Sequence, residues 1–193
     1  MAFSIRSAIV ALTLAIALFA APAQAQPTRQ WGQVGSWLIS VDPSLANSCY
    51  ALHDYDDGTV MRFGSDKSSA DQRWYILFGN DRWRSIEDGG EYNVTLKFDR
   101  EPEWTAVATG VDMGADTNFL YVFGSDPGFI DEFVAKNTLV LTYEGTTVTR
   151  LSLRGSARAA RAMMQCQAEQ VSAPPADPFA GKKKKSLSDP FAN

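Results

Sequence analysis

The sequence predicts a mostly β protein, an antiparallel β-sandwich or open barrel, with a C-terminal helix that a disulfide clips onto the sheet. Three observations predict this fold. Apolar and polar residues alternate between the two cysteines, turn dipeptides interrupt the alternation about every ten residues, and the segment after Ser156 has helical spacing. We expect residues 26–170 to form one domain.

Strands are expected wherever the alternation or a β-branched and aromatic composition is clear. Eight or nine short strands are predicted, over residues 37–41, 49–53, 60–63, 73–78, 92–98, 104–109, 119–123, 139–143 and 148–153. Asp57-Gly58 and Glu144-Gly145 are hairpin turns between neighbouring segments. A short helix is expected from Phe129 to Lys136, behind Asp126-Pro127.

Cys49 and Cys166 are the only cysteines, and one disulfide between them is the simplest pairing. Ala159, Ala162 and Cys166 share one face of the predicted C-terminal helix, so we expect the thiol to face the core. A redox-active or metal-binding pair is the alternative, but the spacing lacks a C-x-x-C motif and other ligands.

The first 25 residues predict a signal peptide. Arg6 supplies a positive charge, residues 8–20 form an apolar run, and Ala23-Gln24-Ala25 places small residues at a cleavage site. An uncleaved anchor or a buried helix is the alternative. Cleavage after Ala25 would deliver the chain to the periplasm or the exterior of a Gram-negative bacterium, with no transmembrane segment in the mature chain.

The C-terminal tail, residues 171–193, changes to a composition that predicts disorder. Two copies of one motif lie in it: Asp177-Pro178-Phe179-Ala180 and Asp189-Pro190-Phe191-Ala192. Each copy places a phenylalanine on a proline-stiffened turn beside a carboxylate, and two copies on one tether could bind a protein partner with avidity. A merely solvated tail with a short duplication is the alternative.

A run of lysines separates the two motifs: Lys182, Lys183, Lys184 and Lys185. Four adjacent ammonium groups could hold the tail against anionic lipid or lipopolysaccharide phosphate. The rest of the chain is acidic, since the whole carries 22 Asp and Glu against 18 Lys and Arg. An acidic domain repels the phosphates of nucleic acid, so we expect no nucleic acid partner.

Residues suited to catalysis are few. His53 is the only histidine, and no nucleophile motif accompanies it. Carboxylates beside tryptophans, Glu101 and Glu103 or Glu87 and Asp88, could form a glycosidase-like acid pair, although solvated turns are the usual role of such residues. We therefore predict no catalytic residues, no cofactor and no metal. Asp54, Asp56 and Asp57 resemble part of a calcium loop but lack its final glutamate, so a hairpin is expected.

Two further patterns involve aromatic residues. Trp83, flanked by Arg82 and Arg84, is a candidate binding residue that could stack on a sugar ring or a partner side chain, or else close one end of the sheet. A Phe-Gly-Ser/Asn-Asp repeat begins at Phe63, Phe78 and Phe123. We interpret it as a repeated strand exit, in which glycine permits a positive φ and the polar residues bond the following amides.

Two segments carry a resemblance to a known family. They are Gly35-Ser36-Trp37-Leu38-Ile39-Ser40, with a cysteine soon after, and Val148-Thr-Arg-Leu-Ser-Leu-Arg-Gly155-Ser156-Ala157 leading into a helix. Together with the β-rich middle, they resemble the invasion-associated locus B proteins over residues 31–167. The chain departs from that family in having Ser156, and no aromatic residue, after Gly155, and in having only two cysteines.

The resemblance implies a small secreted or periplasmic β protein of alphaproteobacteria, implicated in host-cell entry and without an assigned catalytic activity. The sequence thus predicts an exported envelope interaction protein whose tail docks a partner in the envelope or the host. A hydrolase acting on envelope glycans with a carboxylate pair, and a structural or inhibitory module, are the alternatives.

Overall fold

The computed structural model describes residues 27–68, 71, 73–113 and 117–172. The predicted signal peptide lies outside the described residues. So does the C-terminal tail from residue 173, with both Asp-Pro-Phe-Ala motifs and the lysine run.

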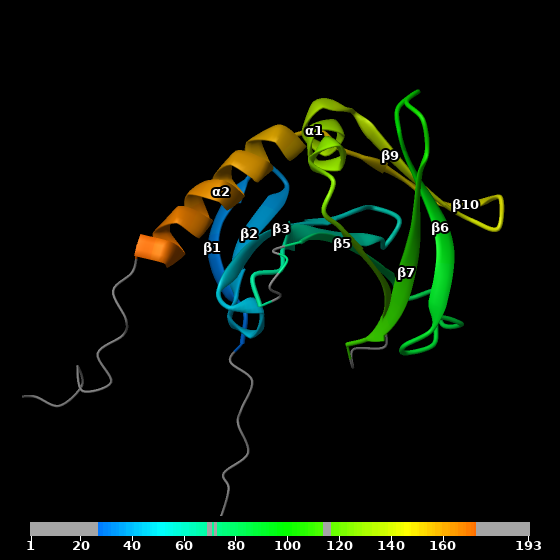
Figure 1. The fold of residues 1–193 in the computed structure, drawn as a ribbon, viewed down its shortest axis with the longest axis horizontal. Helices are drawn as coiled ribbons and strands as arrows, with labels where there is room; N and C mark the ends of the chain where they lie inside the picture. The colour runs from blue at the N-terminus through cyan, green and yellow to red at the C-terminus, as the bar shows by residue number, and fades with distance from the viewer. Residues whose placement is uncertain (1–26, 69–70, 72, 114–116, 173–193) are drawn as a thin grey trace, which may run out of the picture.

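The described chain contains ten strands, two α-helices and one short 3₁₀ helix (Figure 1). The strands are β1 (Arg29–Val34), β2 (Trp37–Asp42), β3 (Ser48–Asp54), β4 (Val60–Ser65), β5 (Trp74–Asn80), β6 (Glu91–Phe98), β7 (Trp104–Asp112), β8 (Asn118–Gly124), β9 (Thr138–Tyr143) and β10 (Thr146–Ser152). The helices are η1 (Pro43–Leu45), α1 (Pro127–Ala135) and α2 (Ser156–Ser172).

All ten strands join one antiparallel sheet in the order β1-β2-β3-β4-β5-β8-β7-β6-β9-β10. The prediction of a mostly β fold with a C-terminal helix packed on an antiparallel sheet is confirmed. The sheet bends strongly, with α1 and α2 along one side of it (Figure 1). β1 to β5 pair in chain order, whereas the β5–β8 and β6–β9 pairs join strands that are distant in the sequence.

Both predicted hairpins are confirmed. β3 pairs with β4 across Asp57-Gly58, and β9 pairs with β10 across Glu144-Gly145. β1 was not predicted, because Arg29–Val34 contains a glycine and few apolar residues, without clear alternation. Its pairing with β2 is irregular between Gln30 and Gly32.

The disulfide between Cys49 of β3 and Cys166 of α2 is present, and it closes a sequence separation of 117 residues. Both cysteines are buried. α2 packs on β2 and β3 and contacts β1 and α1. The predicted orientation of the Cys166 side chain toward the core is therefore confirmed.

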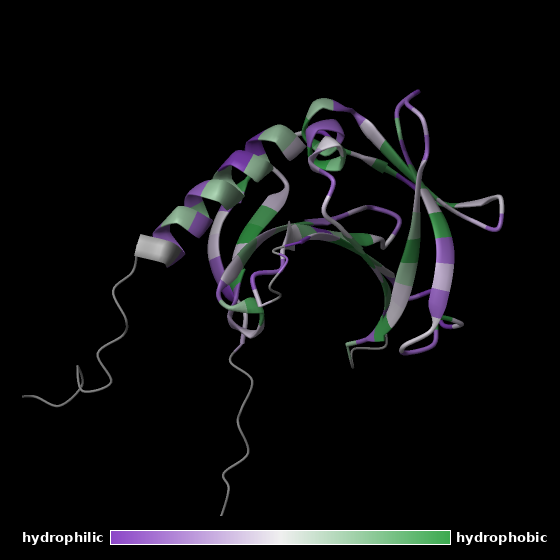
Figure 2. Ribbon diagram, in the orientation of Figure 1, coloured by the Kyte–Doolittle hydropathy of each residue, from purple (hydrophilic) through white to green (hydrophobic). Residues whose placement is uncertain are grey.

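The apolar core lies on the face of the sheet that the helices cover. Asp126 caps α1 by accepting a hydrogen bond from the Gly128 amide, and the helix buries Phe129 and Phe133. Phe133 stacks on Phe63 of β4 with ring centroids 4.3 Å apart, and Phe129 stacks on Trp74 of β5 at 4.1 Å. Figure 2 shows apolar residues recurring along the strands and polar residues on the outer side of α2.

The Phe-Gly-Ser/Asn-Asp repeat ends β4, β5 and β8, as expected, but the proposed role of its glycines is wrong. Gly64, Gly79 and Gly124 do not have a positive φ. Each glycine instead lies opposite an aromatic residue of the neighbouring strand, whose ring occupies the place that a Cβ would take. The close approach of that ring explains the glycine.

The polar residues of the repeat do bond the following amides. Asp66 accepts from the Ser68 amide, Asn80 from the Arg82 amide, and Asp126 from the Gly128 amide. Each side chain thus satisfies a backbone donor two residues later, where the strand gives way to a turn or a helix.

Candidate functional site

A cavity of about 290 Å³ lies where the β1–β2 turn, the end of β3 and the β10–α2 connection meet. Its polar lining residues are Ser36, His53, Ser152, Arg154 and Arg158. The Trp37 side chain is fully buried, and its indole N–H donates to the carbonyl of Arg154 at 3.0 Å. Three segments that are distant in the sequence thus bring polar groups together at this place.

Two glycines shape the walls of this cavity. Gly35 forms the β1–β2 turn with a φ of +62°, and Gly155 precedes α2 with a φ of +87°. Glycine suits both positions, because side-chain-bearing residues rarely adopt a positive φ. A Cβ placed on Gly35 or Gly155 would lie 4.0 or 3.9 Å from Nη2 of Arg158, so this guanidinium lies beside both turns.

His53 and Ser36 are hydrogen bonded, with 2.7 Å between Nε2 and Oγ. The imidazole stacks on Tyr55, with ring centroids 4.3 Å apart, and meets the edge of Trp37 at 4.9 Å. The phenol of Tyr55 in turn donates to the carbonyl of Ser152. Rings on two sides and one hydrogen bond therefore fix the orientation of the imidazole.

The other nitrogen of His53, Nδ1, is buried and has no hydrogen-bond partner in the part of the chain that the structure describes. A proton there would be a buried donor without an acceptor, which is rarer in proteins than an unsatisfied acceptor. The neutral tautomer that carries its proton on Nε2 fits this surrounding. Nε2–H then donates to Ser36, and the Ser36 hydroxyl hydrogen is free to bond a group in the cavity.

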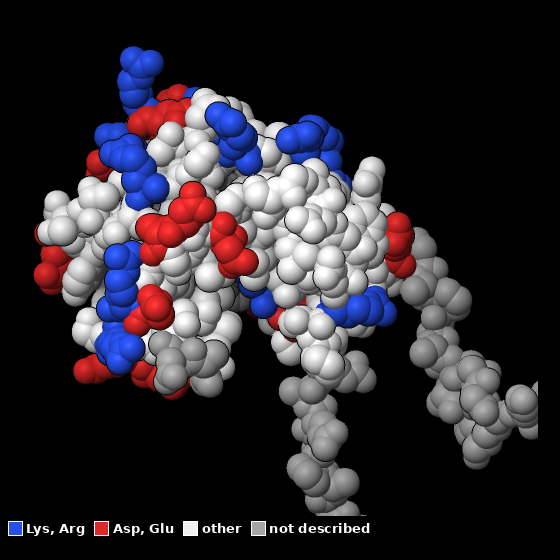
Figure 3. Space-filling view, turned by 180° about the vertical axis from the view of Figure 1, so that it is seen from behind, with Lys and Arg blue, Asp and Glu red and all other residues white. Residues whose placement is uncertain are grey.

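The charged groups of the cavity are both basic. Arg154 and Arg158 are exposed, and neither forms an ion pair with any carboxylate of the described residues. Elsewhere, acidic and basic side chains lie among one another, as on the face shown in Figure 3. Two guanidinium groups and a hydroxyl at one cavity form a set of donors suited to an anion.

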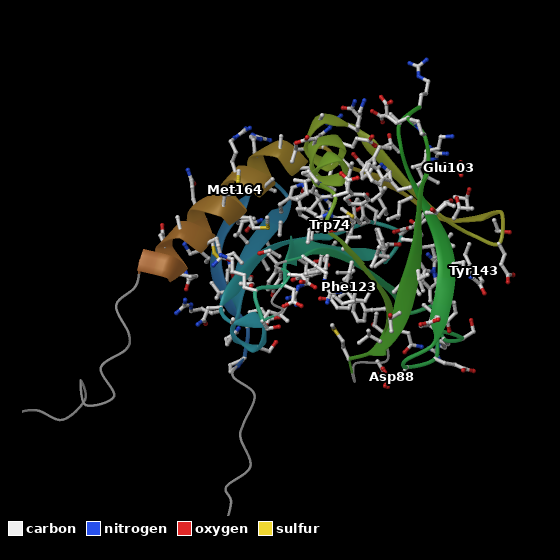
Figure 4. All side chains as sticks on the ribbon, viewed as in Figure 1. Trp74, Asp88, Glu103, Phe123, Tyr143 and Met164 are labelled. Atoms are coloured by element: carbon white, nitrogen blue, oxygen red, sulfur yellow. A yellow bond between two sulfur atoms is a disulfide. The ribbon has the colours of Figure 1, made fainter. Side chains whose placement is uncertain are left out.

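A second cluster of charged and aromatic residues lies on the opposite face of the sheet. Arg62 donates from Nη2 to Asp42 at 2.5 Å and from Nε to the Tyr75 hydroxyl at 2.6 Å, and its guanidinium lies 3.7 Å from the ring centroid of Tyr50. Figure 4 shows Trp74 between the sheet and α1, while Phe123 lies on the side away from the helices.

The groups of this second cluster satisfy one another. Burial alone would raise the pKa of Asp42, but hydrogen bonds from Ser44 and Arg62 and the Arg62 charge hold that pKa below its usual value. Burial raises the pKa of Tyr75, so its phenol stays protonated. Because the donors and acceptors are already paired, we assign the cluster a structural role.

The predicted binding residues Arg82, Trp83 and Arg84 lie in the loop after β5. Arg82 donates to the Asn80 side chain at 3.2 Å and to the carbonyl of Asp57 at 2.7 Å, which ties this loop to the β3–β4 hairpin. Trp83 is half-buried against the core, and Arg84 donates to the carbonyl of Asp81. A ligand role for Trp83 stays a prediction.

The carboxylates that could form a glycosidase-like acid pair take part in separate ion pairs and hydrogen bonds. Glu101 forms an ion pair with Lys136, and Glu103 forms one with Lys97 at 3.4 Å. Asp88 accepts from the amide of Asp112. In the β3–β4 turn, Asp57 accepts from the amide and the hydroxyl of Thr59, as a hairpin residue would.

Within the described ranges, no three His, Cys, Asp or Glu side chains are grouped so that they could hold a metal ion. None of the helices there is long and apolar enough to cross a membrane.

The roles of Ser36, Arg154 and Arg158 were missed by sequence reasoning. The predicted strand begins at Trp37, and Gly35-Ser36 was not predicted as a turn, because the strand before it, β1, was not recognised. A glycine followed by serine before an alternating strand is itself a hairpin signal. Nothing in the sequence pairs the two arginines with His53, which lies about a hundred residues earlier in the chain.

Comparison with known proteins gave no match to any family model, to any curated protein or to any solved structure.

Proposed function

We propose that the chain is an exported envelope binding protein that contacts a partner and catalyses no reaction. The disulfide between Cys49 and Cys166 carries this proposal. Such bonds persist in the periplasm and outside the cell and are rare in the cytosol. The expected cleavage after Ala25 and the resemblance to the invasion-associated locus B proteins support the same location, and the resemblance adds a role in contact with host cells.

The disulfide also fixes the helix from which the C-terminal tail departs. α2 is fastened to β3 at Cys166 and ends at Ser172, and the tail with its two Asp-Pro-Phe-Ala motifs follows directly. A peptide that follows a helix held in this way keeps its bound partner close to the folded domain. Phe179 and Phe191 serve as anchors, and two copies on one tether raise avidity. Lys182 to Lys185 add contact with anionic lipid or lipopolysaccharide.

The arrangement of His53 supports binding over hydrolysis. In a serine nucleophile site, Nδ1 of the histidine donates to a carboxylate, and Nε2 accepts the serine proton. Here Nδ1 of His53 has no partner among the described residues, which favours a proton on Nε2, the nitrogen that would have to act as base.

Envelope pull-downs with four forms of the exported chain test the proposal: the intact protein, a chain stopped after Ala173, Phe179→Ala with Phe191→Ala, and Leu187→Ala. Leu187 is an apolar tail residue outside both motifs and serves as the matched control. We expect a reproducible protein partner with the intact chain and Leu187→Ala, and its loss in the other two. Identical partner lists and identical membrane retention at low salt in all four would contradict tail docking, and specific cleavage of an envelope glycan would contradict the absence of catalysis.

A further inference from the structure

We propose that the cavity lined by Ser36, His53, Arg154 and Arg158 binds the phosphate group of a phosphomonoester. This inference goes beyond partner docking, since it concerns the folded domain and needs no residue of the tail.

The charge of the cavity is the first argument. Arg154 and Arg158 both line it, and no Asp or Glu of the described chain does. Two guanidinium groups repel each other unless an anion lies between them. The chain carries 22 acidic side chains and a net charge of −4, so unpaired arginines here are not a consequence of a shortage of carboxylates. A phosphomonoester carries nearly two negative charges at neutral pH, which matches the two guanidinium groups, whereas a carboxylate carries one.

The uncharged groups of the cavity favour the same ligand. The hydroxyl of Ser36 is held by the 2.7 Å hydrogen bond to His53, and with the His53 proton on Nε2 its own hydrogen is free to donate to an oxygen acceptor. The start of α2, a helix of 17 residues, borders the cavity at Gly155, so the positive end of the helix dipole lies beside it, although the amides of Ser156 and Arg158 already donate to backbone carbonyls. A phosphate has enough oxygens to accept from a hydroxyl and two guanidinium groups at once.

The shape of the cavity limits the ligand to a small group. Its volume of about 290 Å³ lies at the lower end of the range for small-molecule sites. Gly35 and Gly155 let a ligand come close to the backbone, and the buried ring of Trp37 closes one side. A phosphate with a few neighbouring atoms fits this space, and the rest of the molecule would extend outside.

The test uses NMR of the full exported chain, because His53 is the only histidine and its ring signals report on this cavity alone. Inorganic phosphate and glycerol 3-phosphate are titrated above the second pKa of phosphate at constant ionic strength, with acetate as the comparison anion. We expect saturable shifts of the His53 ring signals with both phosphates. The Trp37 indole signal should move with them, because its N–H is bonded to the carbonyl of Arg154.

Variants separate specific binding from general attraction. Arg158→Gln should weaken phosphate binding about tenfold or more, because a charged hydrogen bond is lost. Arg161→Gln removes an exposed arginine of the same helix that does not line the cavity, and we expect it to bind as the parent does. Ser36→Ala should weaken binding by a smaller factor. An unchanged backbone amide spectrum away from the cavity shows that each variant is folded.

Three outcomes would overturn the proposal: no saturable shift, equal weakening by Arg158→Gln and Arg161→Gln, or acetate binding as tightly as phosphate.

If phosphate binds, vesicles of phosphatidylcholine with and without phosphatidic acid identify its source. Cosedimentation that needs phosphatidic acid and is lost in Arg158→Gln assigns the phosphate to a lipid headgroup, and unchanged cosedimentation of Arg158→Gln assigns it to a soluble phosphomonoester. Retention of the vesicles by Lys182 to Lys185 would be the same in the parent and in Arg158→Gln, and no result depends on Phe179 or Phe191, so the tail proposal is tested separately.

Discussion

The two faces of the sheet bury side chains of different kinds. The face beneath the helices holds stacked rings, such as Phe63 on Phe133 at 4.3 Å. The opposite face buries an ion pair, in which the side chains of Arg62 and Asp42 are 12% and 9% exposed, together with the phenol of Tyr75. Burial alone therefore does not distinguish an apolar core from a polar cluster in this molecule.

The two faces are stabilised by different interactions. Rings between the sheet and α1 are stabilised by apolar area and packing, which depend on size and shape. Arg62 needs polar partners for its buried charge, and it donates to Asp42 and to Tyr75. Removing one partner there leaves a charge without compensation, whereas replacing the whole pair need not destabilise the fold.

The largest expected effect is on the face beneath the helices. Phe133→Ala should lower the free energy of unfolding by about 4 kcal/mol, because the fully buried ring leaves a cavity between α1 and β4. Ile130→Ala on the same helix should cost clearly less, since Ile130 is only partly buried. Urea unfolding measures both. Equal losses in the two variants would show that Phe133 is not a central core residue.

A smaller loss is expected on the opposite face. Asp42→Asn should lower the free energy of unfolding by about 3 kcal/mol, because Arg62 would keep its charge without its carboxylate partner. Asp42→Leu combined with Arg62→Met should recover most of that loss, since no charge then stays buried. A double variant less stable than Asp42→Asn would mean that the cluster cannot be replaced by apolar packing.

The same pair has a pH signature. The folded-state pKa of Asp42 lies below its usual value of 3.8, so its contribution to stability is complete above that value and is lost as the pH falls toward the folded-state pKa. The difference in stability between the parent and Asp42→Asn should therefore be constant from about pH 7 to pH 5 and shrink below about pH 4. A difference that grows in acid would contradict the lowered pKa.

Much of the fold could be predicted from alternation and turn chemistry. Every strand except β1 overlaps a predicted segment, and the hairpins, α1, α2 and the disulfide follow from local patterns and from the two cysteines. The strand order could not be predicted, because the pairs β5–β8 and β6–β9 depend on contacts between distant segments. No local pattern in the sequence encodes such a contact.

The candidate site was less predictable for the same reason. His53 could be singled out as the only histidine, but its partner Ser36 and the neighbouring arginines come together only through the pairing of β1, β2 and β3 and the packing of α2. Burial on the face away from the core cluster was also not predictable. Alternation alone would have assigned three residues of that face to solvent, yet they are buried: Tyr50, Tyr75 and Leu77. The guanidinium of Arg62 lies over the rings of Tyr50 and Tyr75, and the Tyr121 ring contacts that of Tyr75.

The smallest effects on stability are expected for the substitution of one glycine on each face of the sheet. Gly124 lies under the Trp74 ring on the core face, and Gly79 lies under the Phe119 ring on the opposite face. A methyl group at either position would collide with the ring above it. Trp74 is held in place, because its indole N–H donates to the carbonyl of Asp126 at 3.0 Å and its ring is nearly buried. Phe119 is only partly buried, so we expect its ring to turn outward more easily than that of Trp74.

We therefore expect Gly124→Ala to cost about 2 kcal/mol and Gly79→Ala about 1 kcal/mol, since overpacking is costly only where the neighbour cannot move. Gly32→Ala is the matched control, because a Cβ on this strand glycine meets no atom within 4 Å and its φ is not positive. Urea unfolding of the three variants measures the series. If Gly79→Ala costs more than Gly124→Ala, the ring of Phe119 is as fixed as that of Trp74, and the opposite face is packed as tightly as the core.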